Sequence, residues 1–285
     1  MERFGARLRA AVAQRGPLCV GVDPHPSLLR QWGLSDDPDG LAAFTRTIVE
    51  ALADRIAIFK PQSAFFERFG SRGIAVLESL LRDLRAAGAL VLLDVKRGDI
   101  ASTMEAYADA YLHPDSPLCA DAVTLHPYLG VGALAPAVAR ARAYGRGAFV
   151  LALTTNPEAA ATQRAVGPDG RSVAQRVVDE IAQLNQGDAE VTEGPAAGSF
   201  GVVIGATVGA GGLDLSRLNG PVLVPGLGAQ GASAADLRAG FGADLSALLP
   251  SYSRQVLAAG PGVAGLRAAA QRALDDCKRV LMAAA

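Results

Sequence analysis

The sequence is poor in several features that would indicate a particular kind of protein. Aromatic residues make up only 5% of its 285 residues, and its three cysteines, Cys19, Cys119 and Cys277, lie far apart. Three scattered cysteines form neither a disulfide framework nor a metal cluster, so we expect a reducing, cytoplasmic location. No apolar stretch approaches the roughly 20 residues that span a bilayer, and the first residues lack the pattern of a secretory signal. We therefore expect a soluble protein without a membrane partner.

The chain also lacks an excess of charge of either sign. It has 27 basic and 28 acidic side chains, which gives a formal net charge of −1 with neutral histidines. Proteins that bind nucleic acids neutralise phosphates with a surplus of positive charge, so this balance argues against a nucleic-acid partner. Half of the residues are hydrophobic. With so few aromatic rings, the core must consist mainly of Ala, Val, Leu and Ile, which suits helices packed closely on a sheet.

Short apolar runs alternate with segments of helical period along the whole chain. Continuous rather than alternating hydrophobicity is typical of strands buried on both faces. Eight such runs occur, at residues 18–22, 56–59, 90–95, 122–125, 148–153, 200–204, 221–224 and 244–249. Segments with apolar residues three and four apart predict helices at 1–15, 41–54, 73–87, 102–112, 132–144, 172–184 and 232–239.

Eight repeats of strand and helix favour an α/β fold of one kind, a closed (β/α)8 TIM barrel, over an open doubly wound sheet. A barrel of this kind usually has about 250 residues. No break in the pattern resembles an interdomain linker, so we expect residues 1–285 to form a single barrel domain. The segment 185–198 is rich in Gly, Glu and Pro, and we expect it to be a surface loop before the sixth strand.

Charged residues stand where three of the predicted strands end. Asp23 ends the first strand, Lys60 the second, and Asp94 and Lys96 the third. Active sites of barrels lie at this carboxyl end of the strands. Because side chains alternate along a strand, Asp94 and Lys96 share one face and Val95 points into the helical layer. A structural salt bridge is the alternative, but buried opposite charges are seldom kept for stability alone, so the cluster indicates a catalytic site.

A further carboxylate, Asp99, follows Lys96 by three residues, past Gly98, which permits a sharp turn into the next helix. Its plainest structural role would be the N-cap of that helix, where a carboxylate accepts hydrogen bonds from free backbone N–H groups. The pattern alone favours neither this role nor a catalytic one.

The pattern Asp94-x-Lys96-x-x-Asp99 after an apolar strand, with Asp23 and Lys60 on the strands before it, resembles the orotidine 5′-phosphate decarboxylase family. A related 3-keto sugar-phosphate decarboxylase barrel shares the short motif, so the order of several segments makes the resemblance specific. The matching segments lie at 20–24, 59–62, 93–103, 154–157, 205–207 and 225–231. The stretch 59–67, FKPQSAFFE, resembles the longer bacterial subgroup (type 2) of that family.

The resemblance implies a carboxy-lyase that removes CO₂ from C6 of orotidine 5′-monophosphate to give UMP, the last step of de novo UMP synthesis, without metal or organic cofactor. The electrons left at C6 lie in the ring plane, where the π system cannot delocalise them. By resemblance, a protonated Lys96 stabilises this charge and then supplies the proton. Asp94 would keep Lys96 protonated and oriented beside the departing carboxylate. Lys60 would bridge Asp94 and the ribose, and Asp23 would accept a ribose hydroxyl proton.

The resemblance also implies a homodimer. In this family the second motif aspartate, here Asp99, and the threonine one helical turn later, here Thr103, complete the active site of the neighbouring subunit. Sequence alone does not distinguish an aspartate that reaches its own pocket from one that reaches another chain's.

Phosphate recognition is expected after the seventh and eighth strands. The loop 225–231, PGLGAQG, is glycine-rich and suits capture of phosphate by backbone N–H groups, although many such loops are only turns. By resemblance, Gly228 and Gln230 belong to a lid over the substrate, with Gln230 between phosphate and pyrimidine. Arg254 would bind the phosphate, with a solvated arginine as the alternative. Thr155 matches a residue that binds the pyrimidine edge, but the adjacent Thr154 is an alternative.

Two other functions fit parts of the pattern. The 3-keto sugar-phosphate decarboxylase would use the aspartates to hold Mg²⁺, so metal dependence distinguishes it. A catalytically silent phosphosugar-binding barrel would keep the glycine-rich loop but would have no use for Lys96. His126, at the end of the fourth strand, is a candidate general base by its residue type and position, but we interpret it as a packed or loop histidine. His25 and His113 have no ligand spacing with each other or with the cysteines, and no metal site is predicted.

Overall fold

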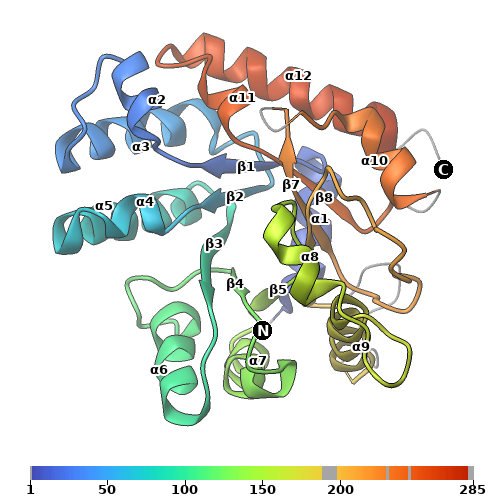
Figure 1. Ribbon diagram of the computed structural model, residues 1–285. Helices are drawn as coiled ribbons and strands as arrows, with labels where there is room; N and C mark the ends of the chain where they lie inside the picture. Colours follow the sequence, from blue (N-terminus) through green and yellow to red (C-terminus); the bar gives the residue numbers. More distant parts are fainter. Residues whose placement is uncertain (1, 188–197, 229–230, 243–244, 282–285) are drawn as a thin grey trace.

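The computed structural model describes residues 2–187, 198–228, 231–242 and 245–281. Its parallel strands pair in chain order, and the last pairs with the first to close a barrel (Figure 1). The predicted (β/α)8 barrel is therefore confirmed. The strands are β1 (Cys19–Val22), β2 (Ile58–Pro61), β3 (Leu90–Arg97), β4 (Ala122–Leu125), β5 (Gly147–Leu153), β6 (Phe200–Ile204), β7 (Val222–Leu227) and β8 (Leu248–Tyr252).

Helices connect the strands and form the outer layer of the barrel (Figure 1). The residues from 205 to 221, between β6 and β7, form turns in place of a helix. The longer helices are α1 (Phe4–Arg15), α3 (Pro38–Leu52), α5 (Gly70–Ala86), α6 (Ala101–Leu112), α7 (Ala135–Ala143), α9 (Val173–Gln186), α10 (Ala234–Phe241) and α12 (Val263–Leu281). The short ones are α2 (Pro26–Gln31), α4 (Ala64–Glu67), α8 (Ala160–Gln163), α11 (Arg254–Leu257) and the 3₁₀ turns η1 (Val131–Leu134) and η2 (Pro157–Ala159).

Capping residues define where several of these helices begin. The Asp37 side chain accepts a hydrogen bond from Gly40 N (2.8 Å), and Pro38 stands in the first turn of α3. The Ser172 hydroxyl does the same for Gln175 N at α9 (3.1 Å). Such side chains satisfy N–H groups that have no partner within the helix, and proline fits the first turn because it lacks one.

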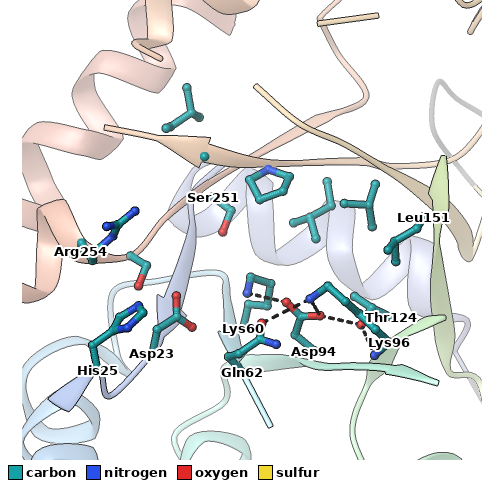
Figure 2. Close-up of a pocket in the computed structure, with 16 residues that line it drawn as sticks. Asp23, His25, Lys60, Gln62, Asp94, Lys96, Thr124, Leu151, Ser251 and Arg254 are labelled. Atoms are coloured by element: carbon teal, nitrogen blue, oxygen red, sulfur yellow. Dashed lines mark hydrogen bonds and ion pairs between the residues drawn. The ribbon is translucent and has the colours of Figure 1, made fainter. Parts of the chain in front are cut away.

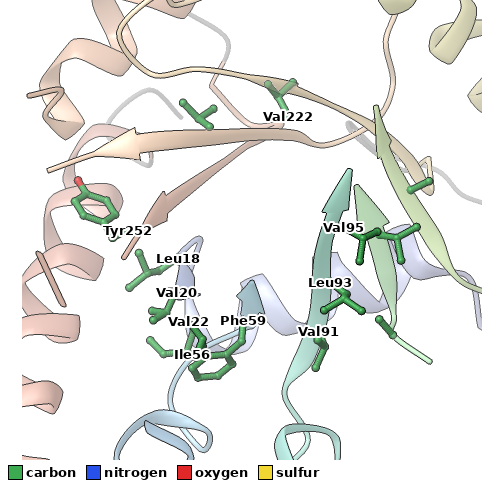
Figure 3. Close-up of a cluster of buried hydrophobic side chains, with 14 of the residues drawn as sticks. Leu18, Val20, Val22, Ile56, Phe59, Val91, Leu93, Val95, Val222 and Tyr252 are labelled. Carbon is green, nitrogen blue, oxygen red and sulfur yellow. The ribbon is translucent and has the colours of Figure 1, made fainter. Parts of the chain in front are cut away.

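Alternation along the strands separates two apolar layers, as β3 illustrates. Leu90 and Leu92 face the barrel interior. Val91, Leu93 and Val95 point outward and pack under the helices (Figure 3). The predicted outward direction of Val95 is therefore confirmed. The same alternation directs the polar residues at the end of the strand toward the barrel mouth.

Helix α1 closes the opposite, amino-terminal end of the barrel. Phe4 is fully buried and meets Phe149 of β5 edge to face, with ring centroids 6.0 Å apart. Beside it, Asp121 pairs with Arg7 of α1 (2.6 Å) and with Arg146 (3.0 Å). Within the described residues, α1 thus covers the amino-terminal end of the barrel interior. The charged residues at the carboxyl ends of the strands lie at the other end, where the cavity opens.

Several boundaries differ from the sequence-based expectations. Strand β2 lies two residues later than predicted, and β8 lies at Leu248–Tyr252 rather than 244–249, whose residue 244 is outside the described residues. Both strands contain proline and a polar residue, which reduced their apolar signal: Lys60 and Pro61 in β2, Pro250 and Ser251 in β8. These polar side chains are nevertheless buried, because they face the barrel mouth.

The predicted surface loop at 185–198 is wrong at its start. Helix α9 continues to Gln186, and Asn185 is fully buried. Its amide donates to the carbonyls of Phe200 (2.8 Å) and Leu218 (2.9 Å) and accepts from Phe200 N (3.1 Å), so it joins α9 to the start of β6. Residues 188–197 of that predicted loop lie outside the described residues.

Candidate active site

A cavity of about 330 Å³ opens at the carboxyl end of the barrel (Figure 2). Charged and polar side chains from neighbouring strands form one part of its lining, and apolar side chains from β5 to β7 form another. Its lining residues are Asp23, His25, Lys60, Gln62, Asp94, Lys96, Thr124, Leu151, Val203, Leu223, Pro225, Gly226, Leu227, Ser251, Ser253 and Arg254.

At the centre of the polar part, Asp94 lies between two lysines. Its Oδ2 accepts a hydrogen bond from Lys60 Nζ at 2.8 Å, and its Oδ1 accepts one from Lys96 Nζ at 2.6 Å. The side chains of Asp94 and Lys60 are each only 7% exposed, whereas that of Lys96 is 44% exposed. Lys60 and Asp94 therefore form a buried pair, and Lys96 presents an ammonium group to the cavity.

The two buried charges keep each other ionised. Burial by itself would raise the pKa of the Asp94 carboxyl, but the positive charges of Lys60 and Lys96 outweigh it and hold that pKa well below its usual value. Burial would likewise lower the pKa of Lys60, but Asp94 and Asp23 raise it above its usual value. Neutralising Asp94 would leave Lys60 as a buried charge without its ion-pair partner, which is strongly unfavourable.

Lys96 is held in an unusual backbone conformation. Its φ is +45°, in the left-handed region that side-chain-bearing residues seldom adopt, and the pairing of β3 with β4 shifts register between Leu93 and Arg97. The Thr124 hydroxyl of β4 stabilises this turn, since it accepts from Lys96 N (3.0 Å) and donates to Asp94 Oδ1 (2.7 Å). Sequence reasoning missed Thr124, and its one signal was a hydroxyl residue within an apolar strand.

A second polar group lies at the other end of the cavity, where Asp23, His25 and Arg254 approach one another (Figure 2). Asp23 Oδ1 and Ser253 Oγ are buried and have no hydrogen-bond partner in the described part of the chain. Gly21 allows Ser253 to lie close to β1, because a Cβ at residue 21 would be only 2.8 Å from Ser253 Cβ. This end of the cavity therefore has unused hydrogen-bonding capacity for a polar ligand.

His25 was not expected in the site. Its ring meets Phe65 at a centroid distance of 4.3 Å. Burial lowers the pKa of its imidazole below the usual value, while Asp23 acts to raise it and Arg254 to lower it further. His25 follows Asp23 by two residues in the loop before α2, and a histidine between two prolines gave no sign of this position.

Some predicted site residues do not line the cavity. Asp99 accepts a hydrogen bond from Ile100 N (2.8 Å), and the N-cap position of α6 is Ile100, so the N-cap interpretation of Asp99 is wrong. Thr103 is exposed on α6. His126 lies beside the cavity lining rather than in it, as a loop residue whose N–H donates to Arg97 O (2.9 Å).

Thr155, its alternative Thr154 and the lid residue Gly228 are also absent from the lining. Thr155 is exposed and packs against Gly205, and Thr154 exchanges hydrogen bonds with Gln163. Gly228, at φ +75°, sits in a turn in which its N–H donates to Ala232 O (2.7 Å). Gln230 lies outside the described residues.

No group of three or more His, Cys, Asp or Glu side chains among the described residues is placed to hold a metal ion. Within the same residues, no helix has the length and apolar character that crossing a membrane requires.

The fold and the site define a class of protein, a (β/α)8 barrel whose Lys60–Asp94–Lys96 network lies at the carboxyl ends of its strands. The family model described as "Orotidine 5'-phosphate decarboxylase / HUMPS family" matches residues 16–269. The chain belongs to this family. The family resemblance found in the sequence, and with it the predicted carboxy-lyase activity, is confirmed.

Individual relatives are similar in sequence to this protein over nearly its whole length. An orotidine 5′-phosphate decarboxylase of Salinispora arenicola is 66% identical over 281 residues, 99% of each chain. One of Streptomyces coelicolor is 58% identical over 276 residues, 95% of this chain and 96% of the relative. The crystal structure of a Streptomyces avermitilis protein is 56% identical and superposes with a TM-score of 0.93, covering 99% of this chain and 97% of that one.

Proposed function

We propose that this protein converts orotidine 5′-monophosphate to UMP and CO₂, with Lys96 as the proton donor. The observation that carries the proposal is the placement of Asp94 between Lys60 and Lys96 at the cavity, in a chain whose relatives bear the name of this activity. The 3-keto sugar-phosphate decarboxylase and the silent binding barrel are not favoured by any comparable observation.

The reaction breaks the bond between C6 and the carboxylate carbon, and the electron pair stays on C6 as CO₂ leaves. An ammonium group beside C6 stabilises this pair and then transfers one proton to it. Lys96 suits this role because its Nζ is bound to Asp94 and yet partly exposed to the cavity. Lys60 is too deeply buried to do the same, and it serves to keep Asp94 ionised.

Substrate binding is assigned to the other end of the cavity. Asp23 has an unpaired carboxylate oxygen that would accept from a ribose hydroxyl, with Lys60 on the same side. Arg254 would present its planar guanidinium to two phosphate oxygens. Gly228 and Gln230 would close over the phosphate, and Thr155 or the adjacent Thr154 would bind the pyrimidine edge.

We further propose a homodimer in which Asp99 and Thr103 complete the partner's site. Asp99 follows Lys96 by three residues and yet does not line the cavity of its own chain. Exposed apolar side chains occur next to Asp99 and in the segment after β4: Ile100 is 59% exposed, and Tyr128 and Leu129 are 81% and 50% exposed. A second copy would cover these side chains. The proposal includes no nucleic-acid partner and no cofactor, and it places the enzyme in the cytoplasm, in line with its free thiols.

The activity is tested by following the loss of orotidine 5′-monophosphate absorbance after treatment of the enzyme with EDTA. We expect turnover without added metal, and Lys96→Ala should lower it by about 10²–10⁴-fold or more, the usual contribution of a general acid. Retained UMP binding by calorimetry would show that this variant folds. Turnover that needs Mg²⁺, or a Lys96→Ala variant of normal rate, would overturn the proposal.

The shared site is tested by mixing two inactive variants, Lys96→Ala and Asp99→Ala. In a symmetric dimer one of the two sites in each hybrid combines Lys96 of one chain with Asp99 of the other. Random exchange should therefore restore about a quarter of the wild-type activity. If subunit exchange is demonstrated by mass spectrometry and no activity returns, the site is not shared.

A further inference from the structure

The left-handed backbone of Lys96 needs support from its surroundings, because a side-chain-bearing residue in this region is stable only where neighbouring groups hold it. Thr124 supplies one contact, to Lys96 N. The side chain of the next residue, Arg97, supplies a second contact, to the backbone of Val95.

Arg97 reaches back across Lys96. Its Nη1 donates to Val95 O at 3.1 Å, so residues 95 and 97 are joined by a hydrogen bond that encloses the backbone of Lys96. Its Nη2 donates to Glu67 Oε1 at 2.7 Å, at the end of α4. The carbonyl of Arg97 accepts from His126 N at 2.9 Å. Arg97 is therefore tied to its own strand, to α4 and to the segment after β4.

Glu67 is in turn connected to Asp94. The same Glu67 Oε1 accepts from Ser63 Oγ at 2.6 Å, and Ser63 N donates to Asp94 O at 3.2 Å. Ser63 is only 3% exposed. A continuous set of hydrogen bonds thus runs from the backbone of Asp94 through Ser63, Glu67 and Arg97 to the backbone of Val95, and it surrounds the turn that carries Lys96.

We propose that Glu67 and Arg97 are positioning residues for the reaction, which hold the backbone of Lys96 so that its ammonium group meets Asp94 and C6 of the substrate. This rests on the proposed role of Lys96. Neither residue lines the cavity. The Glu67–Arg97 contact is half-buried and anchored at both ends, unlike an isolated surface ion pair, which contributes little.

The test compares Glu67→Gln and Arg97→Lys with the wild type. Gln keeps the shape of Glu67 but not its charge, and Lys keeps the charge of Arg97 but cannot bond Val95 O and Glu67 together. We expect kcat to fall about 10- to 100-fold for each, since small misplacement of a reacting group has effects of this size. UMP, which has no carboxylate at C6, should bind within about twofold of wild type, because the substrate-binding groups are untouched.

The neighbouring Arg68–Asp36 ion pair provides the matched control. It joins the end of α4 to the loop before α3 and lies outside the set of hydrogen bonds described around Lys96. Asp36→Asn should leave both kcat and UMP binding unchanged. The double variant Glu67→Gln/Arg97→Lys should lose no more than about the larger single loss, because both changes break the same set of hydrogen bonds.

The outcomes separate this proposal from the proposed function. Normal kcat in both variants, with Lys96→Ala inactive, would overturn the positioning role alone. Equal losses in kcat and UMP affinity, with a lowered Tm, would show that the pair supports the fold in general and would also overturn it. An active Lys96→Ala variant would overturn the proposed function itself.

Discussion

Thr124 has a larger part in the site than its residue type suggests. It is 1% exposed, and its single hydroxyl serves both Asp94 Oδ1 and Lys96 N. Thr124→Val keeps the volume and removes both hydrogen bonds. We expect the free energy of unfolding to fall by about 1–3 kcal/mol, the cost of leaving buried polar groups unpaired, and kcat to fall as well.

Chemical denaturation and steady-state kinetics measure the two effects of Thr124→Val. Thr45 offers a control of similar burial, 4% exposed, whose hydroxyl donates to Ala42 O within α3. Thr45→Val should change the free energy of unfolding less and leave kcat unchanged. Equal behaviour of the two variants would contradict the role given to Thr124.

Asp94 gives the stability a defined dependence on pH. Its pKa in the folded protein is depressed by Lys60 and Lys96 against the raising effect of burial. The stabilisation is therefore fully present above the pKa of an unfolded aspartate, about 3.9, and is lost as the pH falls below that value toward the folded pKa. In Asp94→Asn the free energy of unfolding should be lower at pH 7 and should decline less steeply below pH 4 than in the wild type. Urea titrations between pH 2 and pH 7 measure the free energy of unfolding of both proteins. The same dependence on pH in Asp94→Asn and wild type would refute the prediction.

At the residue scale, the sequence predicts the charged groups better than their neutral partners. Asp23, Lys60, Asp94, Lys96 and Arg254 were expected at the site and line the cavity. Charges at the ends of apolar strands are rare enough to be recognised. The contacts of Thr124 depend on the register between β3 and β4, and a hydroxyl residue in a strand has no distinctive pattern. The roles of Asp99 and Thr103 stay predictions.

Among the secondary-structure elements, α1 has a function separate from the site. It covers the amino-terminal end of the barrel, and Phe4 packs against Phe149 in the interior. Phe4→Ala should lower the free energy of unfolding by about 3–5 kcal/mol, the usual cost of removing a buried phenyl group. At temperatures where the variant is folded, kcat should stay near the wild-type value, since the helix lies at the opposite end from Lys96.

Denaturant unfolding measures this effect, with Val12→Ala on the same helix as the control, because Val12 is only partly buried. A similar loss in both variants would show that the helix contributes through its whole apolar face rather than through Phe4.

The boundaries of the elements were predictable where the residue pattern is uninterrupted. Strands β4 and β6 begin and end where the sequence predicts. Strands β2 and β8 do not, because their buried polar and proline residues resemble loops. The helices α2, α4, α8 and α11 were not recognised, since four to six residues are too few to reveal a helical period. Two of these short helices, α4 and α11, carry Glu67 and Arg254. The long helix α12 (Val263–Leu281) is also absent from the predicted helices.

For the molecule as a whole, all three thiols are enclosed. Cys19, Cys119 and Cys277 are free and fully buried. Burial is the main cause that raises the pKa of Cys19 and of Cys277 to about 12. Alkylation needs an accessible thiolate, so the folded protein should resist iodoacetamide at pH 8, whereas the unfolded chain should take up three adducts. Intact-mass spectrometry gives the count, and rapid modification of the folded protein would contradict the prediction.

The lining of the cavity is divided between the two halves of the chain. The charged groups Asp23, Lys60, Asp94 and Lys96 come from β1 to β3, whereas Leu151, Val203 and Leu223 of β5 to β7 form an apolar wall. The reactive charged groups are thus encoded in the first hundred residues, and the apolar wall is encoded between residues 151 and 223. Changes at the apolar wall can therefore alter which substrate fits without removing the groups that react, so the barrel allows specificity and chemistry to evolve, or to be engineered, one at a time.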